Sequence, residues 1–169
     1  PKHPHTGEQL FCGLPLGAEA NCGYFEESSS FGYFWFRLFF GEGYDDRSFS
    51  FAEHYDQLLS AIGKDFTANS PDLSAFAAHG GKFLTYSGTE DPNGPWADAL
   101  KYYNRVCDFM GGYEKTRGFF KHFMLPGRGH SERGRGPFYP FGHDLSESLL
   151  TALRKWREEG VAPEYLLGA

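Results

Sequence analysis

The second half of the sequence alternates between short apolar segments and segments of helical period, and this order constrains the fold most. Residues 82–87 (KFLTYS) are flanked by glycines, a pattern typical of a buried strand. Residues 118–125 (GFFKHFML) predict a second strand, which Pro126-Gly127 ends. One helix is predicted between the strands and another after them. This order predicts an α/β fold, with helices packed on a parallel sheet whose strands end at one edge.

The helix between the strands has clear start and stop signals. Pro95 stands at its beginning and Gly111-Gly112 at its end. Because Cys107 falls on its apolar side, we expect an inert buried thiol there rather than a nucleophile. The apolar side chains recur at the helical period: Trp96, Ala99, Leu100, Tyr103, Val106, Cys107 and Met110.

The last helix is predicted over residues 145–159. Asp144 and Glu147 have the spacing of a capping box, and Gly160 followed by Pro163 marks the end. The side chains that we expect to face the sheet are Leu145, Leu149, Leu150, Leu153 and Trp156.

The first fifty residues predict no regular element, because Gly and Pro recur every few positions. The aromatic run at residues 31–40 (FGYFWFRLFF) has neither a clean helical nor a clean strand period. We expect its rings to pack in a core or between domains, with a wall of a substrate site as the alternative. A helix is predicted from Ala52 to Ile62, where Gly63 helps to end it, and a loop follows at residues 70–72.

The composition argues against two classes of partner. Apolar residues make up 40% of the chain and charged residues 22%, and no run approaches the roughly 18 apolar residues of a membrane span. The net charge of -6 disfavours a nucleic-acid binder. Residues 127–136 are rich in Arg and Gly but have no aromatic residues between the arginines. We therefore expect neither a membrane nor a nucleic acid as partner.

Cysteines and amino-terminal histidines predict no metal site. The three cysteines allow one disulfide at most. His3, His5, Cys12 and Cys22 match no zinc-binding spacing. We therefore expect no cofactor bound by this chain.

Two loops at the carboxyl ends of the predicted strands carry the residues with catalytic potential. Asp91 follows the first strand, and His130 follows the second, 39 residues later. In α/β-hydrolases the triad acid and histidine follow the serine in this order. The imidazole acts as general base and then general acid, and the carboxylate orients it. Glu90, next to Asp91, is the fallback acid.

The segments around these two residues strongly resemble one enzyme family, the tannases and feruloyl esterases. Residues 80–92 (GGKFLTYSGTEDP) are similar to the family's acid-bearing pattern GGKLILYHGWADP, and residues 123–130 (FMLPGRGH) to its FMVPGMGH. The resemblance runs in order through nearly the whole chain. Further matching segments are TGEQL at 6–10, PDLSAF at 71–76, YYNRV at 102–106 and EGVAPE at 159–164.

The resemblance implies a fold and an activity. Residues 51–169 would form the carboxyl-terminal part of an α/β-hydrolase core, and residues 1–50 the last part of an inserted lid domain. Asp91 would be the triad acid and His130 the triad base. The family hydrolyses esters of aromatic acids such as gallate and ferulate through an acyl-enzyme. The 18 Phe, 10 Tyr and 3 Trp fit this activity, because flat phenolic groups need aromatic walls.

The nucleophile of such an enzyme is missing from the sequence. No Gly-x-Ser-x-Gly elbow occurs in it. The family places this serine upstream of the lid, so we expect it on an amino-terminal segment of the same precursor or on a separate chain. A first residue other than Met fits excision from a longer precursor. The alternative is a non-catalytic assembly fragment or a degenerate subunit of such an esterase.

The sequence also departs from the family's pattern. Ser131 stands where the family has a cysteine that forms a disulfide to a cysteine near the nucleophile, so another contact has to hold these loops in register. Ser87 and Thr89 replace a histidine and a tryptophan near the acid. The resemblance further implies a structural calcium in the upstream lid and secretion, although residues 1–10 are not a signal peptide.

Overall fold

The computed structural model describes residues 2–18, 31–130, 134–136 and 149–166. These residues fall into two compact units. The first takes its residues from Pro1–Cys12 and Cys22–Asn69, and the second from Gly13–Asn21 and Ser70–Ala169. The assignment of residues 1–50 to a lid stays a prediction. Within the described ranges, no helix has the length and apolar character needed to cross a membrane.

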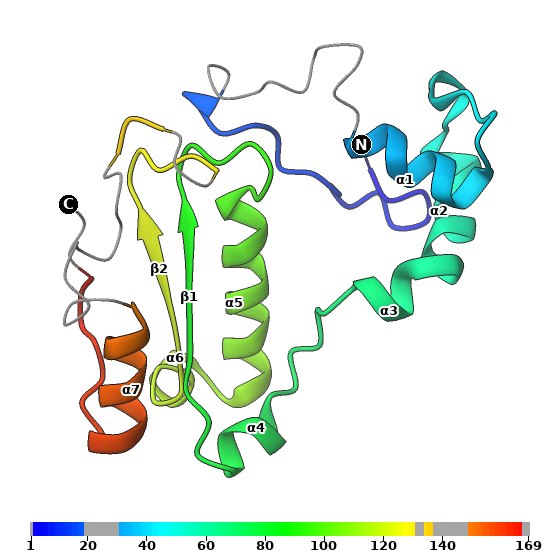
Figure 1. Ribbon diagram of the computed structural model, residues 1–169. Helices are drawn as coiled ribbons and strands as arrows, with labels where there is room; N and C mark the ends of the chain where they lie inside the picture. Colours follow the sequence, from blue (N-terminus) through cyan, green and yellow to red (C-terminus); the bar gives the residue numbers. More distant parts are fainter. Residues whose placement is uncertain (1, 19–30, 131–133, 137–148, 167–169) are drawn as a thin grey trace. The chain divides into compact units, whose positions relative to one another are not determined.

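The second unit is built on two parallel strands. Strand β1 (Phe83–Gly88) pairs with β2 (Phe120–Leu125) over their whole length, with Phe83 opposite Phe120 and Gly88 opposite Leu125. Helix α5 (Trp96–Met110) connects them, as the alternation along the sequence predicted. Both strands therefore end at one edge of the sheet (Figure 1).

Helix α5 covers one face of the sheet with an aromatic core (Figure 1). The rings of Phe83 and Phe120 stack with centroids 4.5 Å apart, and the Tyr103 ring meets Phe120 edge-on at 4.9 Å. Cys107 is buried in the same cluster, which confirms its predicted place on the packed side of the helix. The left-handed Gly111, with φ 91°, ends the helix as predicted.

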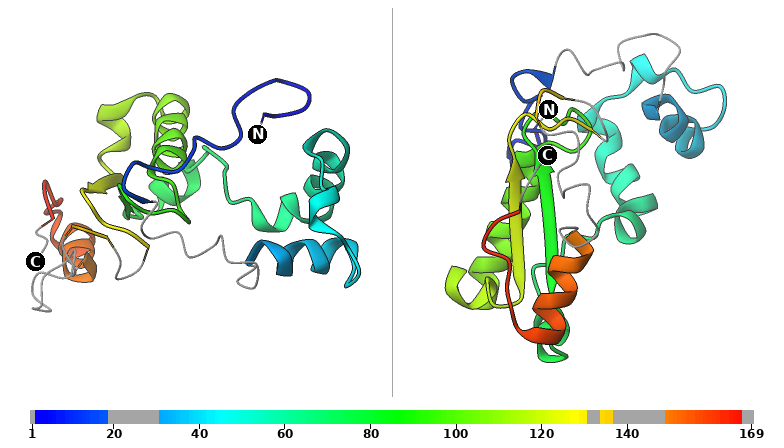
Figure 2. Two further views of the ribbon diagram at one scale, coloured as in Figure 1. Left: turned by 90° about the horizontal axis from the view of Figure 1, so that it is seen from above. Right: turned by 60° about the vertical axis from the view of Figure 1, so that its left-hand side comes forward.

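Helix α7 (Leu149–Glu159) covers the opposite face, as the turned view on the right of Figure 2 shows. Trp156 is buried, and the Nζ atoms of Lys82 and Lys121 lie 5.1 and 5.8 Å from the centroid of its ring.

The expectation that Leu150 faces the sheet is wrong, because this side chain is 74% exposed. Leu150 is six residues before Trp156, which places it roughly 120° around the helix from that residue. The predicted capping residues Asp144 and Glu147, and the helix start at Leu145, lie outside the described residues.

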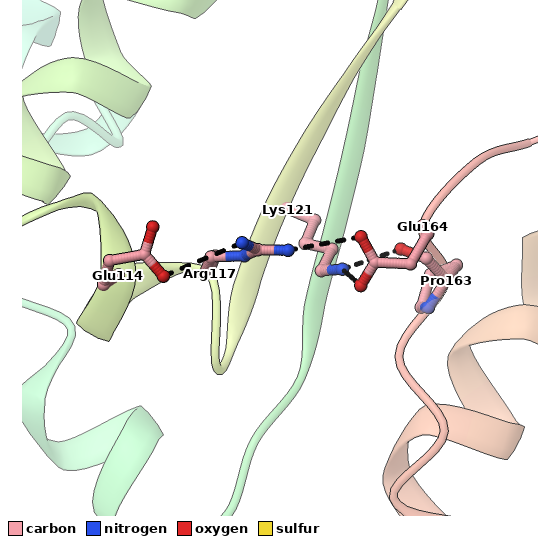
Figure 3. A network of polar contacts seen from close by, with 5 residues as sticks. All are labelled: Glu114, Arg117, Lys121, Pro163 and Glu164. Carbon is pink, nitrogen blue, oxygen red and sulfur yellow. Dashed lines mark hydrogen bonds and ion pairs between the residues drawn. The ribbon is translucent and has the colours of Figure 1, made fainter.

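The segment after α7 is tied back to β2 by an ion-pair network (Figure 3). Lys121, a buried residue of β2, donates from Nζ to the Pro163 carbonyl at 2.8 Å and to Glu164 Oε1 at 2.9 Å. Arg117 donates to Glu164 Oε2 at 3.2 Å and lies 3.7 Å from Glu114. The Lys121 hydrogen bond and charge, with help from Arg117, hold the pKa of the Glu164 carboxyl below its ordinary value.

The sequence does not predict two short helices that the structure contains. Helix α4 (Ser74–Ala78) precedes β1, and α6 (Tyr113–Thr116) precedes β2. Each has too few residues for an apolar period to be recognised.

The first unit contains a helix where none was predicted. Helix α1 (Phe31–Phe40) spans the aromatic run, and its sequence is apolar on nearly every side, which hides the helical period. A 3-10 turn, η3 (Asp46–Ser48), follows. Helix α2 (Phe51–Leu58) confirms the next predicted helix. The prediction that Gly63 ends the helical segment is wrong, because Gly63 takes ordinary helical angles (φ -57°, ψ -35°) and helical residues follow it.

The helical path of this unit continues beyond α2 through a π-helical turn, η4 (Leu59–Gly63), into α3 (Lys64–Phe66). An aromatic cluster lies beside α1 and α2. The ring centroids of Phe40 and Tyr44 are 4.3 Å apart, and the His54 ring lies 5.4 Å from Phe49. Phe36 and Phe40 of the aromatic run thus contact other rings of the same unit and are half-buried, and the choice between core or interdomain packing and a substrate wall stays a prediction.

Candidate functional site

The loop after β1 fixes the predicted acid, Asp91. Its backbone N–H donates to the Gly88 carbonyl at 3.3 Å. Its carboxylate Oδ1 accepts the backbone N–H groups of Asn93 at 2.8 Å and Gly94 at 3.0 Å, so the side chain is held by the turn that follows it. Only 17% of the Asp91 side chain is exposed. The sequence between β1 and α5 thus holds a carboxylate at the carboxyl edge of the sheet.

The predicted histidine, His130, lies in contact with that carboxylate. Its Nδ1 is 3.1 Å from both Asp91 Oδ1 and Asp91 Oδ2. Because a carboxylate accepts hydrogen bonds, this contact favours the tautomer in which Nδ1 carries the proton and Nε2 is a proton acceptor. About half of the His130 side chain is exposed. The structure therefore brings together the two residues that the sequence singled out.

Backbone contacts close the loop that carries His130. Gly136 donates its N–H to the Gly127 carbonyl at 2.7 Å, and Arg128 and Gly134 form an antiparallel bridge. Gly127 has φ 70°, in the left-handed region that favours glycine. These contacts fold the chain back on itself around His130.

The acid loop and the histidine loop also hold each other directly. The Gly127 N–H donates to Thr89 Oγ1 at 2.7 Å, and the Glu90 N–H donates to the Arg128 carbonyl at 2.9 Å. A Cβ on Gly88 would overlap that same carbonyl, so glycine is needed for this approach. The contact between Asp91 and His130 thus rests on hydrogen bonds between their two loops.

Glu90, the fallback acid, contacts Arg135 and not His130. Its Oε1 lies 2.8 Å from Arg135 Nε and 2.6 Å from Arg135 Nη2. The hydrogen bond from Arg135 is the main cause that holds the pKa of the Glu90 carboxyl below its ordinary value. Sequence reasoning missed this pair, because no spacing rule links two residues 45 positions apart.

A cavity of about 470 Å³ lies beside the acid and the histidine. Its size is within the range of small-molecule sites. No pattern in the sequence marks the lining side chains other than Asp91 and His130, because they are spread over the end of β1, the loops that follow the two strands and the start of α5. The charged and aromatic side chains of the lining are Tyr86, Asp91, Asp98, Arg128 and His130.

No metal site occurs in the described part of the chain, where His, Cys, Asp and Glu side chains nowhere gather in a group of three or more that could hold an ion. Of the residues weighed as zinc ligands, His3 lies in edge contact with His5, and His5 Nε2 is 2.7 Å from Asp56. Cys22 lies outside the described residues.

Comparison with known proteins defines the class to which this fold and site belong. Residues 40–168 match the family described as tannase and feruloyl esterase. Feruloyl esterase C of Talaromyces stipitatus is 33% identical over 126 residues, which are 70% of this chain and 24% of that protein. The crystal structure of feruloyl esterase B from Aspergillus oryzae matches 81% of this chain and 29% of its own length, with a TM-score of 0.64 and 26% identity. An esterase structure from the same organism gives a TM-score of 0.68 and 29% identity over 80% of this chain and 29% of its own.

The chain belongs to the tannase and feruloyl esterase family, and its fold is part of an α/β-hydrolase. It spans about a quarter of the length of the curated relatives that it matches. The family and fold implied by the sequence resemblance are therefore confirmed.

Proposed function

We propose that the complete protein hydrolyses carboxylic esters of phenolic acids, with Asp91 and His130 as two members of a Ser-His-Asp triad. The observation that carries the proposal is the 3.1 Å contact of His130 Nδ1 with the Asp91 carboxylate, at the edge where both parallel strands end. Relatives named feruloyl esterases support the ester class, and the cavity beside the pair has room for an acyl group.

The chemistry assigned to His130 has two steps. In the first, Nε2 takes the proton of the serine hydroxyl as its oxygen attacks the ester carbonyl, and then gives it to the leaving alkoxide. In the second, Nε2 takes a proton from water, whose oxygen attacks the acyl-enzyme, and returns it to the serine oxygen as the acid leaves. Asp91 keeps the Nδ1 proton in place and stabilises the imidazolium formed in each step.

The serine belongs to the proposal as a residue outside this sequence. It would lie on an amino-terminal segment of the same precursor or on a partner chain, with residues 1–50 as the end of a lid between that segment and the core. Secretion of the complete protein and a calcium ion in its lid are further parts of the proposal, and both rest on the family resemblance alone. A phosphonate probe that labels activated serines, followed by mass spectrometry, would identify the polypeptide that carries the nucleophile.

Substitution of the histidine tests the assignment directly. In the complete protein, His130→Ala should lower kcat/KM for methyl ferulate or methyl gallate by about a thousandfold or more, because loss of one triad member removes most of the rate. The matched control is His79→Ala, since His79 is an exposed histidine whose Nδ1 contacts the backbone carbonyl of Ala75, four residues earlier. Turnover that survives in His130→Ala would refute its role. A wild-type protein with no hydrolysis and no probe-labelled serine would favour the non-catalytic assembly role.

A further inference from the structure

A buried carboxylate next to Asp91 has no role in the proposed reaction. Glu90 is 4% exposed. Besides the two contacts of its Oε1 with the Arg135 guanidinium, its Oε2 accepts the Arg135 backbone N–H at 3.4 Å. Among the described residues, every hydrogen bond to this carboxylate comes from Arg135. Burial of a charge is costly without a partner, so the position of the Glu90 side chain depends on this arginine.

Arg135 lies at the base of the histidine loop. It is next to Gly134 and Gly136, the two residues whose backbone contacts with Arg128 and Gly127 close that loop. Glu90 is the direct neighbour of Asp91 in the other loop. The ion pair therefore joins the part of the histidine loop that follows His130 to the residue that directly precedes Asp91.

A third segment packs over the ion pair. Gly17, with φ 93°, lies so close that a Cβ on it would overlap Arg135 Nη2 and come 3.1 Å from the Glu90 carboxyl carbon. Gly13 has nearly the same backbone conformation, with φ 94°, but a Cβ on it would meet nothing within 4 Å. Alanine at either position costs similar backbone strain, and only alanine at 17 would push on the ion pair.

We propose that Glu90 is a positioning residue which, through Arg135, holds the His130 loop against the Asp91 loop. The expected effect of Glu90 on turnover rests on the proposed function. The contact that it explains, from His130 Nδ1 to Asp91, is observable without any substrate.

The competing account is that the two charges act on His130 only through their electric fields. Glu90→Gln removes a negative charge and Arg135→Met a positive one, so fields alone would move the acidic limb of the pH profile of kcat/KM in opposite directions. A loosened contact with Asp91 would move it to lower pH in both variants, because the imidazolium loses its carboxylate partner. The sign of the Arg135→Met shift therefore separates the two accounts.

The experiment uses the complete protein and two readouts. The first is the downfield proton NMR signal of the hydrogen-bonded Nδ1–H of His130, assigned by its loss in Asp91→Asn. The second readout is the kinetics of ester hydrolysis, namely kcat, KM and the acidic limb of the pH profile of kcat/KM. In both Glu90→Gln and Arg135→Met we expect the signal to broaden or vanish, kcat to fall about ten- to hundredfold with KM nearly unchanged, and the limb to move to lower pH.

Matched controls carry the same charge changes elsewhere. Glu158→Gln and Arg154→Met alter an exposed pair on α7 and should keep the signal and the turnover of the wild type. If Glu90→Gln does not fold, Gly17→Ala against Gly13→Ala tests the same ion pair, with signal loss expected only for Gly17→Ala.

Persistence of the signal in both Glu90→Gln and Arg135→Met, or limb shifts of opposite sign, would overturn the positioning role. A wild-type protein that shows the signal and loses it in these variants, yet hydrolyses no ester, would leave the positioning role standing and refute the proposed function. The two proposals thus fail by different results.

Discussion

The two faces of the β1–β2 sheet are held by different chemistry. On the α5 face, Phe83, Phe120 and Tyr103 pack ring against ring around a core without ionised groups. On the α7 face, the Nζ atoms of Lys82 and Lys121 lie over the Trp156 ring, and the Lys121 ammonium is bound by carbonyl and carboxylate oxygens. The first face is held mainly by apolar contacts, and its titratable His122, beside Tyr103, has a pKa lowered by burial, whereas part of the second face depends on ionised groups. Both faces fix the strands whose ends carry Asp91 and His130.

The largest expected effect comes from the apolar face. Phe120 is 1% exposed, and Phe120→Ala should lower the free energy of unfolding by about 3–5 kcal/mol, because it removes a buried ring and leaves a cavity. Urea unfolding of the complete protein measures this loss. Phe109→Ala on the outer side of α5, where Phe109 is 56% exposed, is the control and should change it by less than about 0.5 kcal/mol. Equal losses in the two variants would contradict the assignment of the core to this face.

A smaller effect is expected on the α7 face. Lys121→Met keeps a long apolar side chain but removes the ammonium that donates to Pro163 and Glu164, so we expect a loss of about 1–2 kcal/mol in the same measurement. The exposed Lys155 of α7 provides the control Lys155→Met. If Lys121→Met lowers the free energy of unfolding as much as Phe120→Ala does, the polar contacts of the α7 face contribute as much as the apolar core of the α5 face, which would contradict this ranking.

The smallest effect concerns the charge of Glu164, which is two-thirds exposed. Its pKa lies below the ordinary value of 4.5, so its stabilising contribution is full above pH 4.5 and is lost as the pH falls through the lower pKa of the folded state. Glu164→Gln should therefore unfold at a slightly lower urea concentration than the wild type at pH 7, and the difference should disappear in acid. Glu158→Gln, an exposed control on α7, should show no such trend. A difference that grows in acid would contradict the sign of this shift.

Elements with several agreeing local signals were predicted well. Helix α5 has a start signal at Pro95, an apolar stripe and a left-handed glycine after its end, and it spans the predicted residues. The aromatic run at 31–40 is helical without such signals, because an almost uniformly apolar segment has no polar side that would define a period. Leu150 shows that an apolar residue type alone does not predict the inward side, because its angle around the helix turns it away from Trp156.

The sequence by itself determined the family, the alternation of strands and helices, and the choice of Asp91 and His130, because these are encoded in contiguous segments and in chain order. Only the tertiary structure decided how those two residues meet. The 3.1 Å contact depends on Thr89, the glycines of the histidine loop and the Glu90–Arg135 ion pair, which come from segments far apart in the sequence. Hydrogen bonds and ion pairs of this kind form at distances of about 3 Å between groups that no local period relates, so a reading along the chain does not reveal them.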